Sequence, residues 1–170
     1  KFFEDLSQYQ LTSQPGDKYQ YSNEGTDLIG YILENVYQQS LSTLITKLIT
    51  EKSGEKQTKF RLSDKELSNI TQGTNSEGSL MPLLSPYSFA SGGLTSTTES
   101  ISSYMQYLLS SPAAEVTLSQ TLLSGSARRY GNSFLWNTYQ YDSDKPVIYQ
   151  SGGSMGTSTW LALYPKQEIA

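Results

Sequence analysis

Two side chains that could exchange protons and hydrogen bonds with a bound molecule stand together in the triplet Tyr21-Ser22-Asn23. A phenol can act as general acid or base when a nearby cation stabilises its ionised form, and a carboxamide both donates and accepts hydrogen bonds. Because the triplet directly precedes a stretch with helical spacing, both groups can point into one cleft. On the triplet alone, a packing tyrosine beside an ordinary helix cap is the simpler interpretation.

A second candidate is the glycine-rich run Gln150-Ser151-Gly152-Gly153-Ser154-Met155-Gly156. We place this run between two expected strands, where glycines commonly form a turn or a bulge. Part of it also fits the Gly-x-Ser-x-Gly nucleophile elbow, which must lead from a strand into a helix and whose serine needs a histidine base. Since a strand is expected over 157–164 and the chain has no histidine, we interpret Ser154 as a turn residue.

The composition excludes several catalytic classes. The 170 residues include no cysteine and no histidine. The chain therefore cannot build a disulfide, a cysteine nucleophile, a thiolate or histidine zinc site, or a Ser/His/Asp triad. Carboxylates close in sequence have simpler interpretations as solvated turns or helix starts, so we expect neither a metal site nor a cofactor. These are Glu4 with Asp5, Glu24 with Asp27, and Asp142 with Asp144.

Charge and hydropathy limit the classes of binding partner that we expect. The formal net charge is −4 and no run of Lys or Arg occurs, which argues against a nucleic-acid partner. No apolar stretch approaches the roughly 18 residues of a membrane span, and no signal peptide opens the chain, although a leader could have been lost with upstream sequence. The abundance of Tyr, Ser, Thr and Gln resembles exported bacterial proteins and predicts a periplasmic or cell-surface location.

The elements expected to position the candidate groups begin as helices. Apolar residues spaced along one helical face predict a helix over 24–38 and a second from about residue 41, packed on the first and ended by Gly54. In the first helix these residues are Leu28, Ile29, Ile32, Leu33 and Val36. Residues 55–86 are polar and interrupted by Gly and Pro, which predicts a long surface loop.

Two more helices are expected before the pattern changes. Ser96-Thr97-Thr98-Glu99 predicts a capping box, in which the Ser96 hydroxyl and the Glu99 carboxylate satisfy opposing amides at a helix start. Pro112 suits the first position of a further helix that ends at Gly125. Its inward residues would be Leu118, Leu122 and Leu123.

Strands are expected in the last third of the chain. Aromatic and branched residues concentrate in three short segments, 130–136, 146–149 and 157–164, with Asp142-Ser143-Asp144-Lys145 as a hairpin turn between the first two. Helices followed by antiparallel strands predict an α+β fold.

Residues 15–36, which include the Tyr-x-Asn triplet, resemble the second catalytic motif of the serine β-lactamase and penicillin-binding-protein superfamily nearly position by position. This superfamily includes class C β-lactamases, D,D-peptidases and esterases. The Ala90-Ser91-Gly92-Gly93-Leu94 turn and Tyr130-Gly131 with Trp136 resemble it in the same order. Ser151 and Gly152 match the last two positions of its Lys/His-Thr/Ser-Gly triplet, whereas Gln150 stands where a cation or imidazole is usual.

The resemblance implies acyl transfer through a serine acyl-enzyme on an amide, lactam or ester. Tyr21 would relay the proton, and Asn23 would hydrogen-bond the catalytic lysine or a substrate amide. Gln150, Ser151, Gly152 and Gly153 would line the strand edge that binds a small-molecule or peptide substrate. Because Gln150 brings no positive charge, the substrate preference is expected to differ from the usual one.

The nucleophile of this superfamily is a Ser three residues before a Lys on a helix. The formal match Ser53-Gly54-Glu55-Lys56 follows the Tyr motif, instead of preceding it, and we attribute it to chance. The expected Ser and Lys would lie upstream of Lys1, so residues 1–170 would form the later part of one β-lactamase-like domain, truncated at the N-terminus and also short at the C-terminus. We expect the isolated chain to be inactive.

Three interpretations stay open at this point. The chain could be the larger piece of an active hydrolase, part of an inactive relative that binds peptide or cell-wall fragments, or a fragment of structural relevance alone. A Ser-x-x-Lys upstream of Lys1 would support the first.

Overall fold

The computed structural model describes residues 2–83, 89–126, 130–142 and 145–170. Its helices are α1 (Phe2–Ser7), α2 (Asn23–Tyr37), α3 (Leu41–Ile45), the π-helical turn η1 (Thr46–Thr50), α4 (Glu51–Ser53), α5 (Asp64–Leu67), α6 (Thr98–Ser110) and α7 (Ala114–Ser119). Its strands are β1 (Ser124–Gly125), β2 (Gly131–Asn132), β3 (Asn137–Asp142), β4 (Lys145–Ser154) and β5 (Thr157–Leu163).

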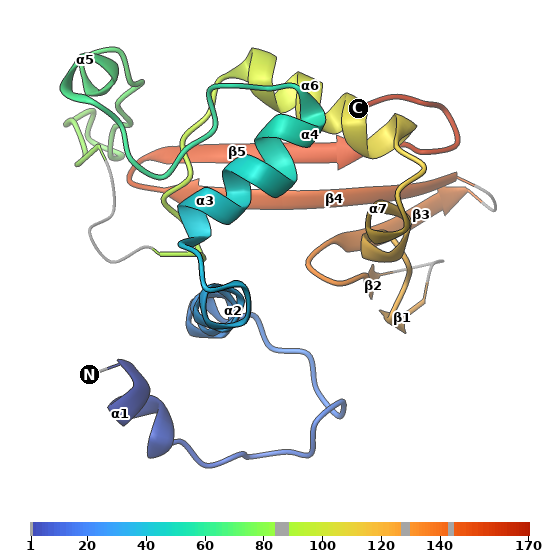
Figure 1. Ribbon diagram of the computed structural model, residues 1–170. Helices are drawn as coiled ribbons and strands as arrows, with labels where there is room; N and C mark the ends of the chain where they lie inside the picture. The colour runs from blue at the N-terminus through green and yellow to red at the C-terminus, as the bar shows by residue number, and fades with distance from the viewer. Residues whose placement is uncertain (1, 84–88, 127–129, 143–144) are drawn as a thin grey trace.

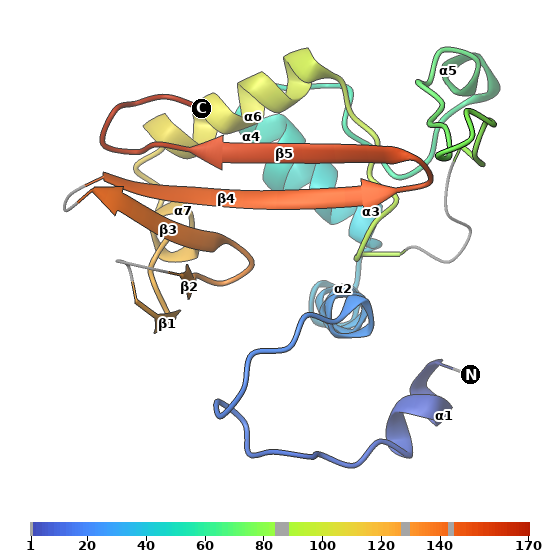
Figure 2. The same ribbon diagram turned by 180° about the vertical axis from the view of Figure 1, so that it is seen from behind.

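The strands form one antiparallel sheet in the order β1-β2-β3-β4-β5, so each strand pairs with its neighbour in sequence. Helices α3 to α4, α6 and α7 lie over one face of this sheet (Figure 1). From behind, β3, β4 and β5 lie in front of the helices with no element over them (Figure 2). The predicted α+β class is therefore confirmed, with the helices in one layer and the sheet in the other.

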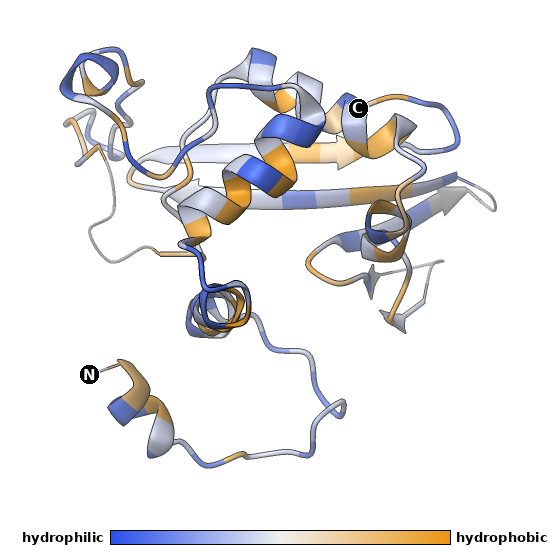
Figure 3. Ribbon diagram, viewed as in Figure 1, coloured by the Kyte–Doolittle hydropathy of each residue, from blue (hydrophilic) through white to orange (hydrophobic). Residues whose placement is uncertain are grey.

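The core lies between α6, α7 and the sheet. Met105, Leu108, Val116, Ile148 and Leu163 form one buried cluster. Figure 3 shows the apolar residues of β4 and β5 concentrated where β4 starts and β5 ends, whereas the halves next to the connection between the two strands are more polar. The apolar half of the β4–β5 pair therefore packs in the core, and the more polar half, next to the connection, lines the clefts described below.

Helix α2 matches the prediction of 24–38 to within one residue at each end. The Ser22 hydroxyl accepts a hydrogen bond from the backbone N–H of Gly25 at 3.0 Å, which caps the helix. Part of the predicted apolar face is exposed, since Ile32 and Val36 keep 51% and 67% of their surface accessible. The local signals thus set the helix limits correctly but not what covers the helix.

The second predicted helix is also present, as the continuous run α3, η1 and α4. It ends at Gly54, whose φ of +71° lies in the left-handed region that favours glycine. This is where the Gly54 signal placed the end.

The capping box predicted at Ser96 to Glu99 is wrong. Thr97 caps α6 instead, because its side chain accepts from the backbone N–H of Ser100 at 3.2 Å. The Ser96 hydroxyl is instead hydrogen-bonded to the Thr58 hydroxyl at 2.7 Å, a contact with a distant segment. A Ser-x-x-Glu contact does form, but at Ser63 and Glu66, in a segment expected to be loop throughout.

The helix expected from Pro112 to Gly125 is shorter than predicted. Helix α7 ends at Ser119, and the Leu123 N–H donates to the Asn132 carbonyl at 2.8 Å, so sheet pairing takes the backbone groups that a longer helix would have used. Gly125 lies in β1. Leu118, Leu122 and Leu123, predicted to point inward, are 55%, 38% and 58% exposed.

The strand limits also need correction. The segment 130–136 contains only the short β2, because the Ser133 N–H donates to the Trp136 carbonyl at 2.9 Å and closes a turn. Strand β3 follows at 137–142, and its pairing of Asp142 with Lys145 brackets the expected hairpin, whose two central residues lie outside the described part. Strand β5 agrees with the predicted 157–164 to within one residue.

Only the last two residues of the glycine-rich run form the turn between strands. Strand β4 continues to Ser154, with Gly152 and Gly153 paired to Thr159 and Ser158 of β5. The turn is made by Met155 and Gly156, both at positive φ (38° and 75°), which is the geometry of a two-residue hairpin loop. Ser154 is thus the last residue of a strand, and no helix follows it as a nucleophile elbow requires.

Candidate active site

A cleft of about 650 Å³ lies where the start of α2, the 91–93 turn, the 132–137 segment and the end of β4 converge. All of the predicted site residues line it, namely Tyr21, Asn23, Gln150, Ser151, Gly152 and Gly153. The fold therefore brings together two motifs that are separated by more than 100 residues of sequence. Their roles in binding or catalysis stay predictions.

The N-terminal end of α2 supplies one wall. Asn23 is the first helical residue and Tyr21 precedes the cap, so the Ser22 cap fixes the backbone from which both side chains leave. Tyr21 is 69% exposed, and it is therefore not the packing residue that the simpler interpretation expected. A phenol in this position is accessible to a bound molecule.

The edge of β4 supplies the opposite wall. The register of β4 with β3 begins at Tyr149 and Asn137, so residues 150–154 extend beyond β3 while they remain paired with β5 on the other side. A strand edge without a neighbouring strand presents backbone donors and acceptors to a ligand. This overhang, residues 150–154, is the part of β4 that lines the cleft.

The Gln150 carboxamide is engaged within the protein. Its Nε2 donates to the Leu135 carbonyl at 2.6 Å, and its Oε1 accepts from Asn137 Nδ2 at 3.1 Å and from the Ser151 N–H at 3.0 Å. These bonds tie the start of the overhang to the 133–137 segment. Gln150 thus lines the cleft and also holds the 133–137 segment in place; we call this segment the 133–137 wall.

The 91–93 turn is fastened to α2 over successive helical turns. Asp27 Oδ1 accepts from the Ser91 N–H at 2.7 Å, and the rings of Tyr31 and Phe89 stack with centroids 4.7 Å apart. Between these contacts, Gly30 allows Ala90 to approach α2 closely. Asp27 was interpreted as a helix-start carboxylate, and its tertiary contact was missed because nothing local in sequence connects residues 27 and 91.

A second cavity of about 680 Å³ adjoins the first, and Gly93 and Ser154 line both. Residues 57–73, part of the predicted surface loop, form one side of this cavity, and the β4–β5 hairpin forms the other. The backbone of the loop contacts the backbone of the hairpin tip directly, because a Cβ on Gly73 would stand only 2.4 Å from the Met155 carbonyl oxygen. The predicted surface loop therefore forms a packed wall at this point.

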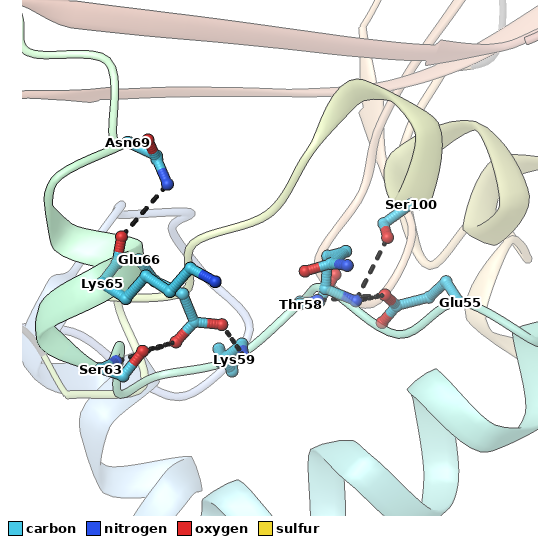
Figure 4. Close-up of polar contacts among 9 residues, drawn as sticks. Glu55, Thr58, Lys59, Ser63, Lys65, Glu66, Asn69 and Ser100 are labelled. Carbon is cyan, nitrogen blue, oxygen red and sulfur yellow. Dashed lines mark hydrogen bonds and ion pairs between the residues drawn. The ribbon is translucent and has the colours of Figure 1, made fainter.

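An ion pair and a helix cap stabilise the conformation of this loop around residues 59–66 (Figure 4). The Lys59 ammonium is paired with Glu66 Oε1, and Glu66 Oε2 accepts from the Ser63 N–H at 2.8 Å and the Ser63 hydroxyl at 2.7 Å. Lys59 also exchanges backbone hydrogen bonds with Thr95, next to the 91–93 turn. We call this set, Lys59, Ser63 and Glu66, the carboxylate clip.

The carboxylate clip is expected to resist acid. The Lys59 hydrogen bond, followed by those from Ser63, lowers the pKa of Glu66 from 4.5 to about 2. A folded-state pKa below the unfolded value means that the stabilisation is complete above about pH 4.5 and is lost as the pH falls through about 2. Carboxyl ¹³C NMR of the folded protein should give a Glu66 midpoint near that lower value.

Matched lysine variants test the cause of this shift. Lys59→Met should raise the pKa of Glu66 towards 4.5. Lys65 lies next to Glu66 on the short helix α5, and Lys65→Met should leave that pKa unchanged. A Glu66 midpoint that does not respond to Lys59→Met would contradict the assigned contact.

Several cleft residues had no signal in the sequence. Asn132, Phe134 and Asn137 line the cleft beside Trp136. They come from the segment whose strand limits were misplaced, so their orientation could not be inferred. Correct placement of the turn at 133–136 would have identified Asn137 as the partner of Tyr149, directly before the overhang.

The model of the family described as Beta-lactamase matches residues 1–170. This chain belongs to the beta-lactamase family. Among curated proteins, "Protein flp" of Staphylococcus aureus (strain N315) is 25% identical over 171 residues, covering 93% of this beta-lactamase-family chain and 33% of that protein. The chain thus spans about a third of the length of the curated relatives it matches.

Solved structures show the same fold as this beta-lactamase-family chain. A class C beta lactamase from Rhodobacter sphaeroides matches with a TM-score of 0.84 and 16% identity, covering 98% of this chain and 57% of that one. The octameric penicillin-binding protein homologue from Pyrococcus abyssi gives 0.76 and 22%, covering 92% and 38%. At these identities the likeness concerns the fold alone.

Within the described residues, no helix has the length and apolar character needed to cross a membrane.

Proposed function

We propose that this chain supplies two walls of the active site of a serine hydrolase that forms an acyl-enzyme on an amide, lactam or ester. The observation that carries the proposal is the meeting of Tyr21 and Asn23 with the β4 overhang in one cleft. Family membership supports the reaction type, and the remainder of the domain would supply the Ser-x-x-Lys segment.

In this mechanism the upstream serine attacks the carbonyl and Tyr21 relays its proton. An exposed phenol at the cleft can do so when the lysine ammonium stabilises the phenolate. Asn23, fixed at the start of α2, would hydrogen-bond that lysine or the substrate amide. Water would then release the acyl group.

The overhang would stabilise the oxyanion. The Ser151 N–H donates to Gln150 Oε1, which also accepts from Asn137 Nδ2 of β3, and backbone groups alternate between the two edges of a strand. The Gly153 N–H therefore lies on the same cleft-facing edge. A backbone N–H aimed at the developing negative charge lowers the barrier for acyl transfer.

The alternative is a catalytically inactive binding protein for peptide or cell-wall fragments. The observation that favours it is the glutamine at position 150, which cannot supply the positive charge usual at this site. Such a protein would use the same cleft without forming a covalent bond.

Covalent labelling of the intact protein distinguishes these functions. Fluorescent penicillin or a fluorophosphonate should label one serine, which mass spectrometry should place upstream of Lys1. Ser53→Ala is a suitable control, because Ser53 donates to the Ile49 carbonyl at 2.7 Å and does not line the cleft, so labelling should persist. Reversible binding without any covalent adduct would support the alternative.

A further inference from the structure

The bonds of Gln150 suggest which acyl donors the cleft accepts. Both functional ends of its carboxamide are engaged, through Leu135, Asn137 and the Ser151 N–H. Both lone pairs of Oε1 and one of the two Nε2 hydrogens are used in these bonds, so Gln150 can offer a substrate a single N–H and no charge without breaking bonds that hold the 133–137 wall. Gln150 is therefore built into the wall and is poorly suited to recognise a substrate.

The described residues that line the cleft carry no formal charge, because their polar groups are hydroxyls, carboxamides and backbone amides. Lys18 precedes the lining residue Tyr19 but is not among them, and the charged residues near Asn23 on α2 are the carboxylates Glu24 and Asp27. Recognition of a carboxylate normally uses a cation or several charge-assisted hydrogen bonds. A substrate carboxylate placed here would lose water without gaining a cation from these walls.

We propose that the cleft selects acyl donors without a carboxylate next to the reacting carbonyl, namely neutral esters, amides or lactams, and that Gln150 is a positioning residue for the 133–137 wall. This inference rests on the proposed hydrolase function. In this inference the backbone of the β4 overhang contacts the substrate, and Gln150 keeps the 133–137 wall in position.

A pair of probes that differ only in the carboxylate tests the selectivity. Benzylpenicillin and its methyl ester would be compared by their second-order acylation rates with the intact protein. The methyl ester should react about tenfold faster or more, since a charge that is desolvated without gaining a partner costs at least about that factor. Gln150→Lys should shift the ratio of the two rates by about tenfold in favour of the free acid.

Gln150→Met separates positioning from binding. It keeps the side-chain length but removes the three hydrogen bonds, so a positioning role predicts that both probes slow by the same factor and that Trp136 fluorescence changes. A loss confined to the free acid would show direct carboxylate binding and overturn the inference. So would faster acylation of the wild type by the free acid.

Failure of the proposed function has a different signature. If neither penicillin probe nor a fluorophosphonate labels the protein, both the hydrolase function and this inference fall. If the fluorophosphonate labels the upstream serine and the free acid is the better penicillin, the hydrolase stands and the selectivity for neutral donors is wrong.

Discussion

Tyr21→Phe in the intact protein is expected to lower the acylation rate about 10²- to 10⁴-fold, the usual contribution of a positioned general acid or base. The substitution removes the hydroxyl that would carry the proton and keeps the ring. Because Tyr21 is 69% exposed, little packing should be lost, so the folded fraction should stay unchanged. Stopped-flow measurement of acylation by a chromogenic ester or lactam gives the rate.

Tyr19→Phe is the matched control for this result. Tyr19 lines the same cleft, two residues away, with 67% of its surface exposed. We expect its loss to change the rate by no more than a few-fold, because it has no assigned role in proton transfer. Equal effects of the two substitutions, or an unchanged rate for Tyr21→Phe, would remove Tyr21 from the mechanism.

Gly30→Ala is expected to destabilise the fold by about 1–3 kcal/mol, the cost of forcing an extra methyl group into a packed site. A Cβ at this position would stand 2.7 Å from Ala90 Cβ and 2.8 Å from Phe89 Cε1. The Ala90 Cβ is fixed to the backbone and cannot move away without shifting the 89–91 segment. The change should therefore also loosen the hydrogen bond between Asp27 and Ser91 that joins α2 to the cleft turn.

Gly25→Ala provides the opposite expectation on the same helix. Its nearest contact would be Ser22 Cβ at 3.5 Å, an ordinary van der Waals distance, so alanine should stabilise α2 by up to about 1 kcal/mol. Urea unfolding midpoints of both variants measure the difference. If Gly30→Ala were neutral or stabilising, the close approach of residues 89–90 to Gly30 would be incorrect.

Local signals explain which elements could be predicted. Helix α2 and the stop at Gly54 depend on groups within one or two helical turns, namely the Ser22 cap and a residue able to adopt positive φ. Such signals are complete within a short window of sequence. The predicted limits were correct for the same reason.

Elements whose backbone groups find distant partners were misplaced. Helix α7 ends early because Leu123 pairs with Asn132, and Ser96 does not cap α6 because its hydroxyl contacts Thr58. The glycines at 152 and 153 look like a turn until their partners in β5 are known. In each case the competing interaction lies outside the window that the pattern covers.

The sequence by itself determined the family and the identity of the candidate groups, because the Tyr-x-Asn and Ser-Gly motifs are ordered residue types that need no coordinates. The tertiary structure alone decided that Tyr21 and Asn23 face residues 150–153 across one cleft. It also decided that the Gln150 carboxamide is engaged by Leu135 and Asn137. Both facts depend on strand register and on long-range hydrogen bonds, which are set by the packing of the whole sheet against its helices.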